Sequence, residues 1–189
     1  MPRDSEATRA RILEAAITEF SAVGFSGARI ERISERSGAN KRMIYVYYTD
    51  KEGLFTATLN EVITKLVSAV TPDHNDLPGY AGSMFDYLIE HPEAVRIAAW
   101  RQLERPTTGP QTTDIYAQKV AAIRAPDLSE TAKAIPPTDL LILVQGMAGA
   151  WLHTPAELLT HDGSDPQSPQ RLASHRAALV EAVRRIVAG

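Results

Sequence analysis

Apolar side chains recur at spacings of three and four residues along most of this 189-residue chain, and no long stretch alternates apolar with polar residues. Residues three and four apart lie on one face of an α-helix, whereas strict alternation is typical of a β-strand. The sequence therefore predicts an all-α fold of about nine helices. The expected helices cover residues 7–23, 28–37, 40–48, 49–66, 79–90, 92–104, 112–124, 137–154 and 168–188.

The chain contains no cysteine. A disulfide framework, a thiolate metal site and a cysteine nucleophile are therefore excluded, which suits a reducing compartment. The first residues, MPRDSEATRARILEAA, lack the apolar core of a secretion signal, and no apolar run approaches the roughly 18 residues that a membrane span needs. We expect a cytoplasmic protein with no membrane span.

The formal net charge is −3, and the positive and negative residues are distributed slightly unevenly along the chain. Residues 1–55 carry nine Lys and Arg against eight Asp and Glu, whereas the remainder carries eleven against fifteen. This distribution is compatible with a basic patch at the N-terminal end and an acidic body. Charge alone does not identify a nucleic-acid partner.

The first seventy residues are expected to form four helices with marked ends. Gly24 and Gly38 stand where the first and second helices should stop, and Asn40 is a good N-cap for the third. The pair of Thr49 and Glu52 is typical of a capping box at the start of the fourth helix. Two short helices joined by a glycine turn indicate a helix-turn-helix arrangement.

The stretch NKRMIYVYYTDKEGLF, residues 40–55, holds three of the six tyrosines directly behind a lysine and an arginine. A helix-turn-helix presents the leading end of its second helix to the DNA major groove, while nearby cations hold phosphates. In this interpretation Ile44 faces inward onto Ile30 and Ile33. The alternative is that the rings only pack a small bundle. The residues expected to contact double-stranded DNA are Asn40, Lys41, Arg42, Met43 and Tyr45 at bases or groove, and Tyr47 and Lys51 at phosphates.

Residues 24–55 resemble the DNA-binding domain of TetR-family transcriptional regulators in the order and spacing of the motif. The matching positions are Gly24, Phe25, Ile30, Ile33, Gly38, Asn40, Tyr45, Tyr47, Lys51, Leu54 and Phe55. The chain departs from the family at Ala28 and Arg29, where a hydroxyl residue often caps the second helix. We expect Ser26 or the backbone at Gly27 to replace that cap.

The resemblance implies a two-part regulator. Residues 1–50 would form the helix-turn-helix DNA-binding domain, and residues 51–189 a helical domain that binds a small-molecule effector and dimerises. It also implies a homodimer through the last two helices, a palindromic operator and, by the habit of the family, a repressor that the effector releases rather than an activator. Residues 137–154 are apolar nearly all round, which a dimer or burial within one chain would explain.

A small-molecule pocket is expected to be apolar with a few polar groups. The candidate ligand-binding residues are Phe85, Trp100, Tyr116, Gln145, Met147 and Trp151, with Arg101 or His153 as further polar contacts. Aromatic side chains at helical spacing also fill cores, and this alternative stays open. The sequence does not indicate the identity of the effector.

Two other classes of all-α protein are an enzyme and a protein-interaction adaptor. The five histidines form no pair four residues apart, and the chain has no phosphate-binding glycine loop, nucleophile elbow or dinucleotide fingerprint. We therefore expect no enzyme and no cofactor. Glu90, His91 and Glu93 could bind a metal, but helix capping at Pro92 explains this sequence, so no metal is expected. The remaining alternative is a helical protein-interaction adaptor that does not bind DNA.

Overall fold

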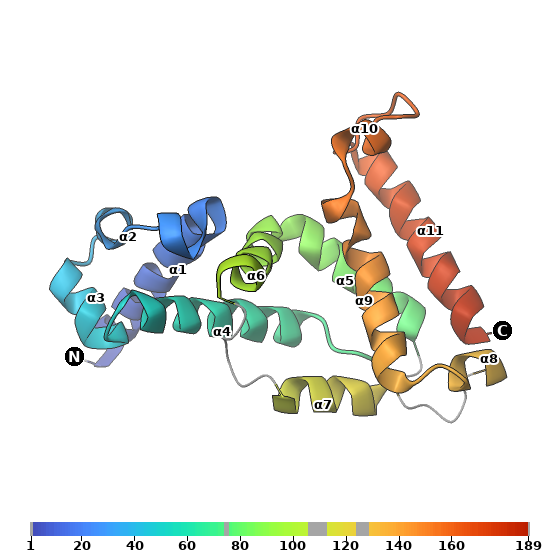
Figure 1. The fold of residues 1–189 in the computed structure, drawn as a ribbon, viewed down its shortest axis with the longest axis horizontal. Coiled ribbons are helices and arrows are strands. Elements are labelled where there is room, and N and C mark those ends of the chain that lie inside the picture. The colour runs from blue at the N-terminus through green and yellow to red at the C-terminus, as the bar shows by residue number, and fades with distance from the viewer. Residues whose placement is uncertain (1, 74–75, 106–112, 124–128, 189) are drawn as a thin grey trace. The chain divides into compact units, whose positions relative to one another are not determined.

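The computed structural model describes residues 2–73, 76–105, 113–123 and 129–188, and these residues form helices and connecting turns with no strand (Figure 1). The predicted all-α fold is confirmed. The helices are α1 (Pro2–Gly27), α2 (Ile30–Ser37), α3 (Lys41–Tyr48), α4 (Lys51–Ala69), α5 (Leu77–Glu90), α6 (Pro92–Glu104), α7 (Thr113–Ala122), α8 (Glu130–Lys133), α9 (Pro137–His153), α10 (Ala156–Leu159) and α11 (Pro169–Ala188).

Each helix expected from the sequence is present within a few residues of its predicted bounds. Helix α6 begins and ends at the predicted residues. Its start is explained by Pro92, which lacks an amide hydrogen and suits the first helical turn. For α7, the predicted end residues 112 and 124 lie outside the described residues. Helices α8 and α10 were not expected, since four residues are too few to show a helical period.

Helix α1 is interrupted at Gly24, whose φ of 72° and ψ of −176° are not helical. The backbone continues in one further turn to Gly27. A side chain at position 24 would be strained at this positive φ. A Cβ there would also come within 2.9 Å of the Trp100 ring of α6. Glycine at position 24 thus marks the predicted helix end and also allows α6 to approach α1.

The chain divides into two compact units, of which the first contains residues 1–67 and 91–111. In this unit α1 packs along α6 and against α2. Three rings meet in its core: the centroid of Phe55 lies 4.9 Å from that of Phe20 and 5.3 Å from that of Phe25. The buried core residues are Ile12, Ala15, Ala16, Phe20, Ala28, Ile30, Ile33, Ala39, Ile44, Leu54, Phe55, Leu59 and Ile97.

The second unit contains residues 68–90 and 112–189. Helix α5 packs against both α9 and α11, and the three helices lie side by side (Figure 1). The backbone N–H of Ser129 donates to the carbonyl of Val187 at 3.0 Å and ties the start of α8 to the end of α11. Buried apolar residues of α5, α9 and α11 include Leu77, Tyr80, Met84, Phe85, Leu140, Leu141, Val144, Ala148, Trp151, Leu179 and Val183.

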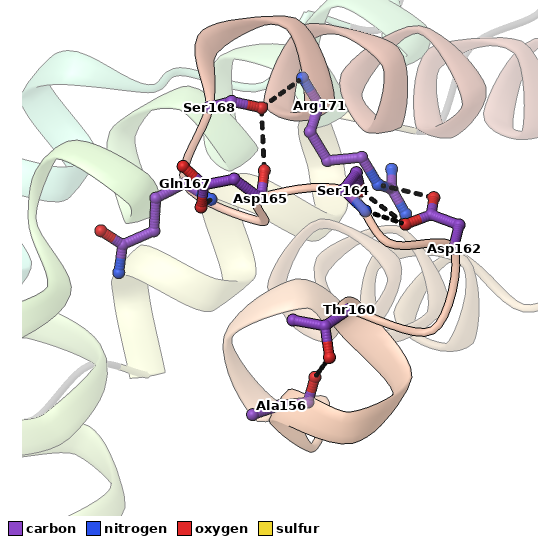
Figure 2. A network of polar contacts seen from close by, with 8 residues as sticks. All are labelled: Ala156, Thr160, Asp162, Ser164, Asp165, Gln167, Ser168 and Arg171. Carbon is purple, nitrogen blue, oxygen red and sulfur yellow. Dashed lines mark hydrogen bonds and ion pairs between the residues drawn. The ribbon is translucent and has the colours of Figure 1, made fainter.

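The connection from α10 to α11 is held by short side chains that accept backbone hydrogen bonds (Figure 2). Asp162 Oδ1 accepts from the Ser164 hydroxyl at 2.6 Å and from the backbone N–H of Ser164 at 2.9 Å, and these two bonds lower the pKa of Asp162. Ser168 Oγ donates to the Asp165 carbonyl at 2.8 Å and accepts from the backbone N–H of Arg171 at 3.3 Å. Ser168 therefore caps the start of α11.

Candidate nucleic-acid interface

The start of α2 is capped from a different helix. Glu19 of α1 accepts the backbone N–H of Arg29 at 3.0 Å and the Nε of Arg32 at 2.7 Å. Arg29 makes no side-chain cap of its own. The expectation that Ser26 or Gly27 would supply the cap is wrong, because the carboxylate of Glu19 takes that place, and the Ser26 amide instead donates to Glu104 at 2.9 Å.

Glu19 is a charged group in a buried position, with only 6% of its surface exposed. Burial by itself raises the pKa of this carboxyl. The hydrogen bonds from Arg32 and Arg29 and the charges of Arg32 and Arg36 outweigh that effect, so the pKa of Glu19 lies below its usual value. Glu19 thus remains ionised at neutral pH and fixes α2 against α1.

The turn between α2 and α3 has the predicted features. Gly38 ends α2 with a φ of 68°, a left-handed conformation that glycine adopts without strain. The Ser34 hydroxyl donates to the Ala39 carbonyl at 2.6 Å, across the turn. Asn40 Oδ1 accepts the backbone N–H of Met43 at 2.8 Å, so the predicted N-cap of α3 is confirmed.

Helix α3 has one buried and one exposed face. Ile44 is fully buried against the core that contains Ile30 and Ile33, as predicted. On the opposite side Val46 is 73% exposed, and Tyr45, about 100° from Ile44 around the helix, is 46% exposed. The reading face is defined here as the exposed side chains of α3: Lys41, Arg42, Met43, Tyr45 and Val46.

Sequence reasoning missed Val46 as a candidate contact residue. A signal was available, because Val46 is four residues after Arg42 and therefore lies on the same face of the helix. Lys41 is exposed but has a partner within the chain, since its ammonium group forms an ion pair with Glu31 of α2. Arg42, by contrast, is exposed and forms no hydrogen bond or ion pair with another described residue.

Tyr47 and Tyr48 at the end of α3 are half-buried against α1. The Tyr47 hydroxyl lies 3.2 Å from Ser5 Oγ, and the Arg9 guanidinium lies 5.3 Å from the centroid of the Tyr47 ring. Burial raises the pKa of Tyr48. Beside them is a hollow of about 590 Å³ at the start of α4, lined by Arg9, Tyr47, Tyr48, Thr49, Asp50, Glu52, Gly53, Thr56, Ala57 and Asn60.

The start of α4 is capped by Asp50, whose Oδ1 accepts the backbone N–H of Gly53 at 2.7 Å. The predicted capping box of Thr49 with Glu52 is therefore wrong by one residue. Thr49 instead has a positive φ of 66° and ends α3, where its N–H donates to the Tyr45 carbonyl.

Lys51 lies directly beyond this cap. Its Nζ is 4.8 Å from the centroid of the Phe25 ring and 3.5 Å from the Ser26 carbonyl oxygen. Burial lowers the pKa of Lys51, although nearby Glu104 opposes this effect. Arg105 lies on the same ring at 4.1 Å, so two cations gather around Phe25.

Two of the candidate ligand-binding residues meet in the second unit. Phe85 and Trp151 are both buried, and their ring centroids lie 5.4 Å and 4.6 Å from that of His175 on α11. His175 Nε2 is buried without a hydrogen-bond partner in the described part of the chain. The burial of this ring, together with the charge of Arg171, lowers the pKa of His175. Sequence reasoning did not select His175.

A hollow of about 230 Å³ lies between α5 and α11, where Arg176 Nε donates to Asp86 Oδ1 at 2.9 Å and to Oδ2 at 2.7 Å. Phe85 is the candidate ligand-binding residue that lines it. The full lining is Phe85, Asp86, Ile89, Glu90, Leu172, Ala173 and Arg176.

The other candidate ligand-binding residues are dispersed. Gln145 Nε2 donates to the Tyr80 hydroxyl at 3.3 Å, and Met147 is half-buried on the same helix, α9. Tyr116 on α7 is 50% exposed. Trp100 belongs to the first unit, where it covers Gly24. The structure does not bring these four residues together with Phe85 in the hollow between α5 and α11.

His91 and Glu93, two of the three residues whose side chains could bind a metal in this segment, form a pair at the start of α6 with 3.1 Å between His91 Nδ1 and Glu93 Oε1. Among the described residues, no group of three or more His, Cys, Asp or Glu side chains could hold a metal ion. Within the same residues, none of the helices combines the length and the apolar character that a bilayer crossing requires.

The fold and the helix-turn-helix geometry agree with comparisons to known proteins. Residues 12–58 match the family described as "Bacterial regulatory proteins, tetR family", and residues 76–185 match the "Tetracyclin repressor-like, C-terminal domain". The chain belongs to the tetR family. The resemblance of residues 24–55 to TetR-family regulators is therefore confirmed, and this tetR-family chain is a helix-turn-helix transcriptional regulator.

Curated tetR-family relatives are regulators rather than enzymes. The chain is 40% identical over 151 residues to the HTH-type transcriptional repressor SCO4008 of Streptomyces coelicolor, which covers 77% of this chain and 79% of the relative. It is 34% identical over 130 residues to the HTH-type transcriptional repressor NicS of Pseudomonas putida, covering 65% of this chain and 58% of the relative.

Solved structures of the family share the fold over nearly the whole chain. The putative transcriptional regulator SCO4942 from Streptomyces coelicolor is 32% identical, with a TM-score of 0.82 over 95% of this chain and 98% of that one. A TetR family transcription regulator from Marinobacter aquaeolei VT8 has a TM-score of 0.68 at 18% identity, over 96% of this chain and 98% of that one. At 18% identity, the similarity to the Marinobacter aquaeolei regulator shows a shared fold only.

Proposed function

We propose that the chain is a homodimeric repressor that binds a palindromic DNA operator through α3 and leaves it when a small molecule binds the C-terminal domain. The observation that carries this proposal is the reading face of α3. Its side chains point away from the core, while Ile44 and the Asn40 cap hold the helix in place. Such a helix can enter a major groove without unfolding any part of the chain.

The roles of individual residues follow from their positions. Asn40, Lys41, Arg42, Met43 and Tyr45 contact base edges or the groove, and Tyr47 and Lys51 contact phosphates. Lys51 suits that role because its ammonium group lies at the start of α4, where the positive end of the helix dipole also favours an anion. Residues 1–50 then constitute the DNA-binding domain, and residues 51–189 the effector-binding and dimerisation domain.

The dimer contact lies on the last two long helices, α9 and α11. Within the single chain α9 leaves two large apolar side chains in solvent, with Ile142 60% and Leu143 48% exposed. Gly146 and Ala150 continue that exposed side and permit close approach of a second helix. Two copies are needed because one short helix reads too few bases, and a two-fold dimer places two reading helices about 34–36 Å apart.

The effector site is the hollow between α5 and α11, which Phe85 lines, together with the rings of His175 and Trp151 that continue from Phe85. This region supports the proposal because it joins buried aromatic surface to the polar pair of Asp86 and Arg176. A site of that composition suits a small molecule with an apolar body and a polar end.

The experiment is selection of bound duplexes from a random DNA pool by the purified full chain at two salt concentrations. A palindromic consensus, with affinity that falls steeply as salt rises, is expected from a dimer that displaces counterions from phosphates. The selected duplex then serves to screen small molecules for release. Absence of enrichment at both salts would refute the proposal and favour a helical protein-interaction adaptor.

A further inference from the structure

The most exposed large apolar side chain of α3 lies at the centre of its reading face. Val46 is 73% exposed, although valine is among the residues most often found inside proteins. With about 100° of rotation per residue, Val46 lies roughly 40° from Arg42 and roughly 160° from the buried Ile44. Core packing therefore does not explain a valine at this position.

The residues around Val46 indicate which class of molecule this side chain contacts. Met43, three residues before it, is 37% exposed and adjoins it on the helix surface. Arg42 lies one turn earlier on the same side and is exposed. Arg36 of the adjoining helix α2 and Arg29 just before it are exposed and add positive charge, whereas Arg32 is paired with Glu19. Val46 and Met43 thus form an apolar surface beside positive charges. Such a surface is complementary to a polyanion that exposes an apolar group between its negative charges.

The DNA major groove offers such a group at one base. Thymine exposes its C5-methyl there, whereas the other groove edges of the base pairs present hydrogen-bond donors and acceptors. Valine can neither donate nor accept a hydrogen bond, so it gains by burying apolar surface. We propose that Val46, with Met43 beside it, selects thymine in each operator half-site by packing on the C5-methyl group.

This inference rests on the proposed function, because it requires α3 to lie in the major groove. It adds a specificity-determining residue and names the base that this residue reads. It also assigns a division of roles within the reading face: Arg42 supplies polar readout one turn before an apolar readout by Val46.

The test replaces each thymine of the selected duplex, one at a time, with deoxyuridine, which lacks only the C5-methyl group. Binding of the full chain is measured for the wild type, for Val46→Ala and for Val46→Thr. Val23→Ala, at a half-exposed valine of α1 away from the reading face, is the matched control. Because Val46 is exposed, these variants should fold, and a thermal melt by circular dichroism verifies that they do.

At one or two thymines per half-site, the wild type and Val23→Ala should lose roughly fourfold in affinity on deoxyuridine substitution, the effect of one buried methyl group. Val46→Ala should show little further loss at the same thymines. Val46→Thr should retain a smaller methyl effect, because it keeps the shape but adds a hydroxyl.

Three results would overturn the inference while leaving DNA binding intact. The first is a consensus without thymine in its half-sites, and the second is equal binding of all deoxyuridine duplexes. The third is a methyl effect that persists undiminished in Val46→Ala, which would assign methyl readout to another residue. A pool that yields no enriched duplex would instead refute the proposed function itself, and the inference with it.

Discussion

Glu19 of α1 and Arg32 of α2 form an ion pair, with 2.6 Å between Glu19 Oε1 and an Arg32 terminal nitrogen and 2.7 Å between the same oxygen and Arg32 Nε. Arg32 also donates to the Gly27 carbonyl at 2.9 Å. One arginine therefore joins the last turn of α1 to a carboxylate buried further up the same helix. This pair, together with the buried Ile30 and Ile33, holds α2 in position, and through it α3.

Glu19→Gln should lower the free energy of unfolding by about 1–3 kcal/mol at pH 7, because the amide keeps one acceptor but loses the charge that Arg32 binds. The pKa of Glu19 is lower in the folded chain, so its stabilising effect is present above the ordinary value of 4.5 and is lost as pH falls through the folded pKa. Urea unfolding at pH 7 and in acid measures both effects. Glu14→Gln, at an exposed position of α1, is the control. A difference from wild type that persists undiminished in strong acid would contradict the role of the charge.

Lys51→Ala and Arg42→Ala should weaken DNA binding in different ways. Loss of a phosphate contact at Lys51 should reduce affinity for all sequences alike and lower the slope of log affinity against log salt by about one. Loss of Arg42 should also relax the preference among operators. Fluorescence anisotropy with the selected duplex and a scrambled one, at several salt concentrations, separates the two. Equal losses on both duplexes for both variants would refute this division.

Tyr47→Phe should weaken DNA binding by roughly tenfold if the hydroxyl donates to a phosphate, since a hydrogen bond to a charged group contributes about 1.5 kcal/mol or more. Ser5→Ala is the informative partner variant, because it removes the contact of this hydroxyl within the chain and leaves the hydroxyl itself. Ser5→Ala should bind DNA as the wild type does. The same loss in both variants would show that the hydroxyl acts by holding α1 against α3.

Ile142→Asp should convert the dimer to a monomer, because it places a charge in the apolar contact on α9 that we propose. Sedimentation velocity measures the change, and binding to a palindromic duplex should fall while binding to a single half-site stays weak and unchanged. Leu158→Asp, at a comparably exposed position of α10, is the matched control and should remain a dimer. An Ile142→Asp variant that sediments as a dimer would place the contact elsewhere.

His175→Gln should flatten the dependence of stability on pH in mildly acidic solution. The pKa of His175 is lower in the folded chain than its ordinary value of 6.5, so the unfolded chain binds the proton more readily. Stability is therefore complete above pH 6.5 and falls as pH drops below it. Thermal melts between pH 5 and 8 compare the wild type with His175→Gln and with His161→Gln, at an exposed histidine. Equal slopes in the wild type and His175→Gln would contradict the assignment.

The helices were predictable because their signals are local. Pro92 and the apolar period define α6, and the side chain of Asn40 caps α3 within one turn. The errors concern contacts between distant residues or a choice between neighbours. Glu19 caps a helix that starts after position 29, and no spacing rule connects them. Thr49 and Asp50 are both good caps, and the backbone conformation at Thr49 decides between them.

The candidate DNA contacts were accessible to sequence reasoning because they lie within a dozen residues of one motif. The candidate ligand pocket was not, because a pocket depends on how several helices meet. Phe85 and Trp151 adjoin through His175, a residue selected by no pattern in the sequence. Trp100 has an apolar ring like theirs, yet it covers a glycine in the first unit.

The anchoring of α3 through Ile44 has a practical consequence for protein engineering. Ile44 makes the fully buried contact, Tyr47 and Tyr48 pack against the core at the end of the helix, and Asn40 caps its start. The outward positions 42 and 46 can therefore be randomised together in a library without removing a buried contact, whereas Met43 and Tyr45 are each more than half covered. Selection of such a library on altered duplexes should yield regulators with new operator preferences that unfold at the same denaturant concentration as the parent.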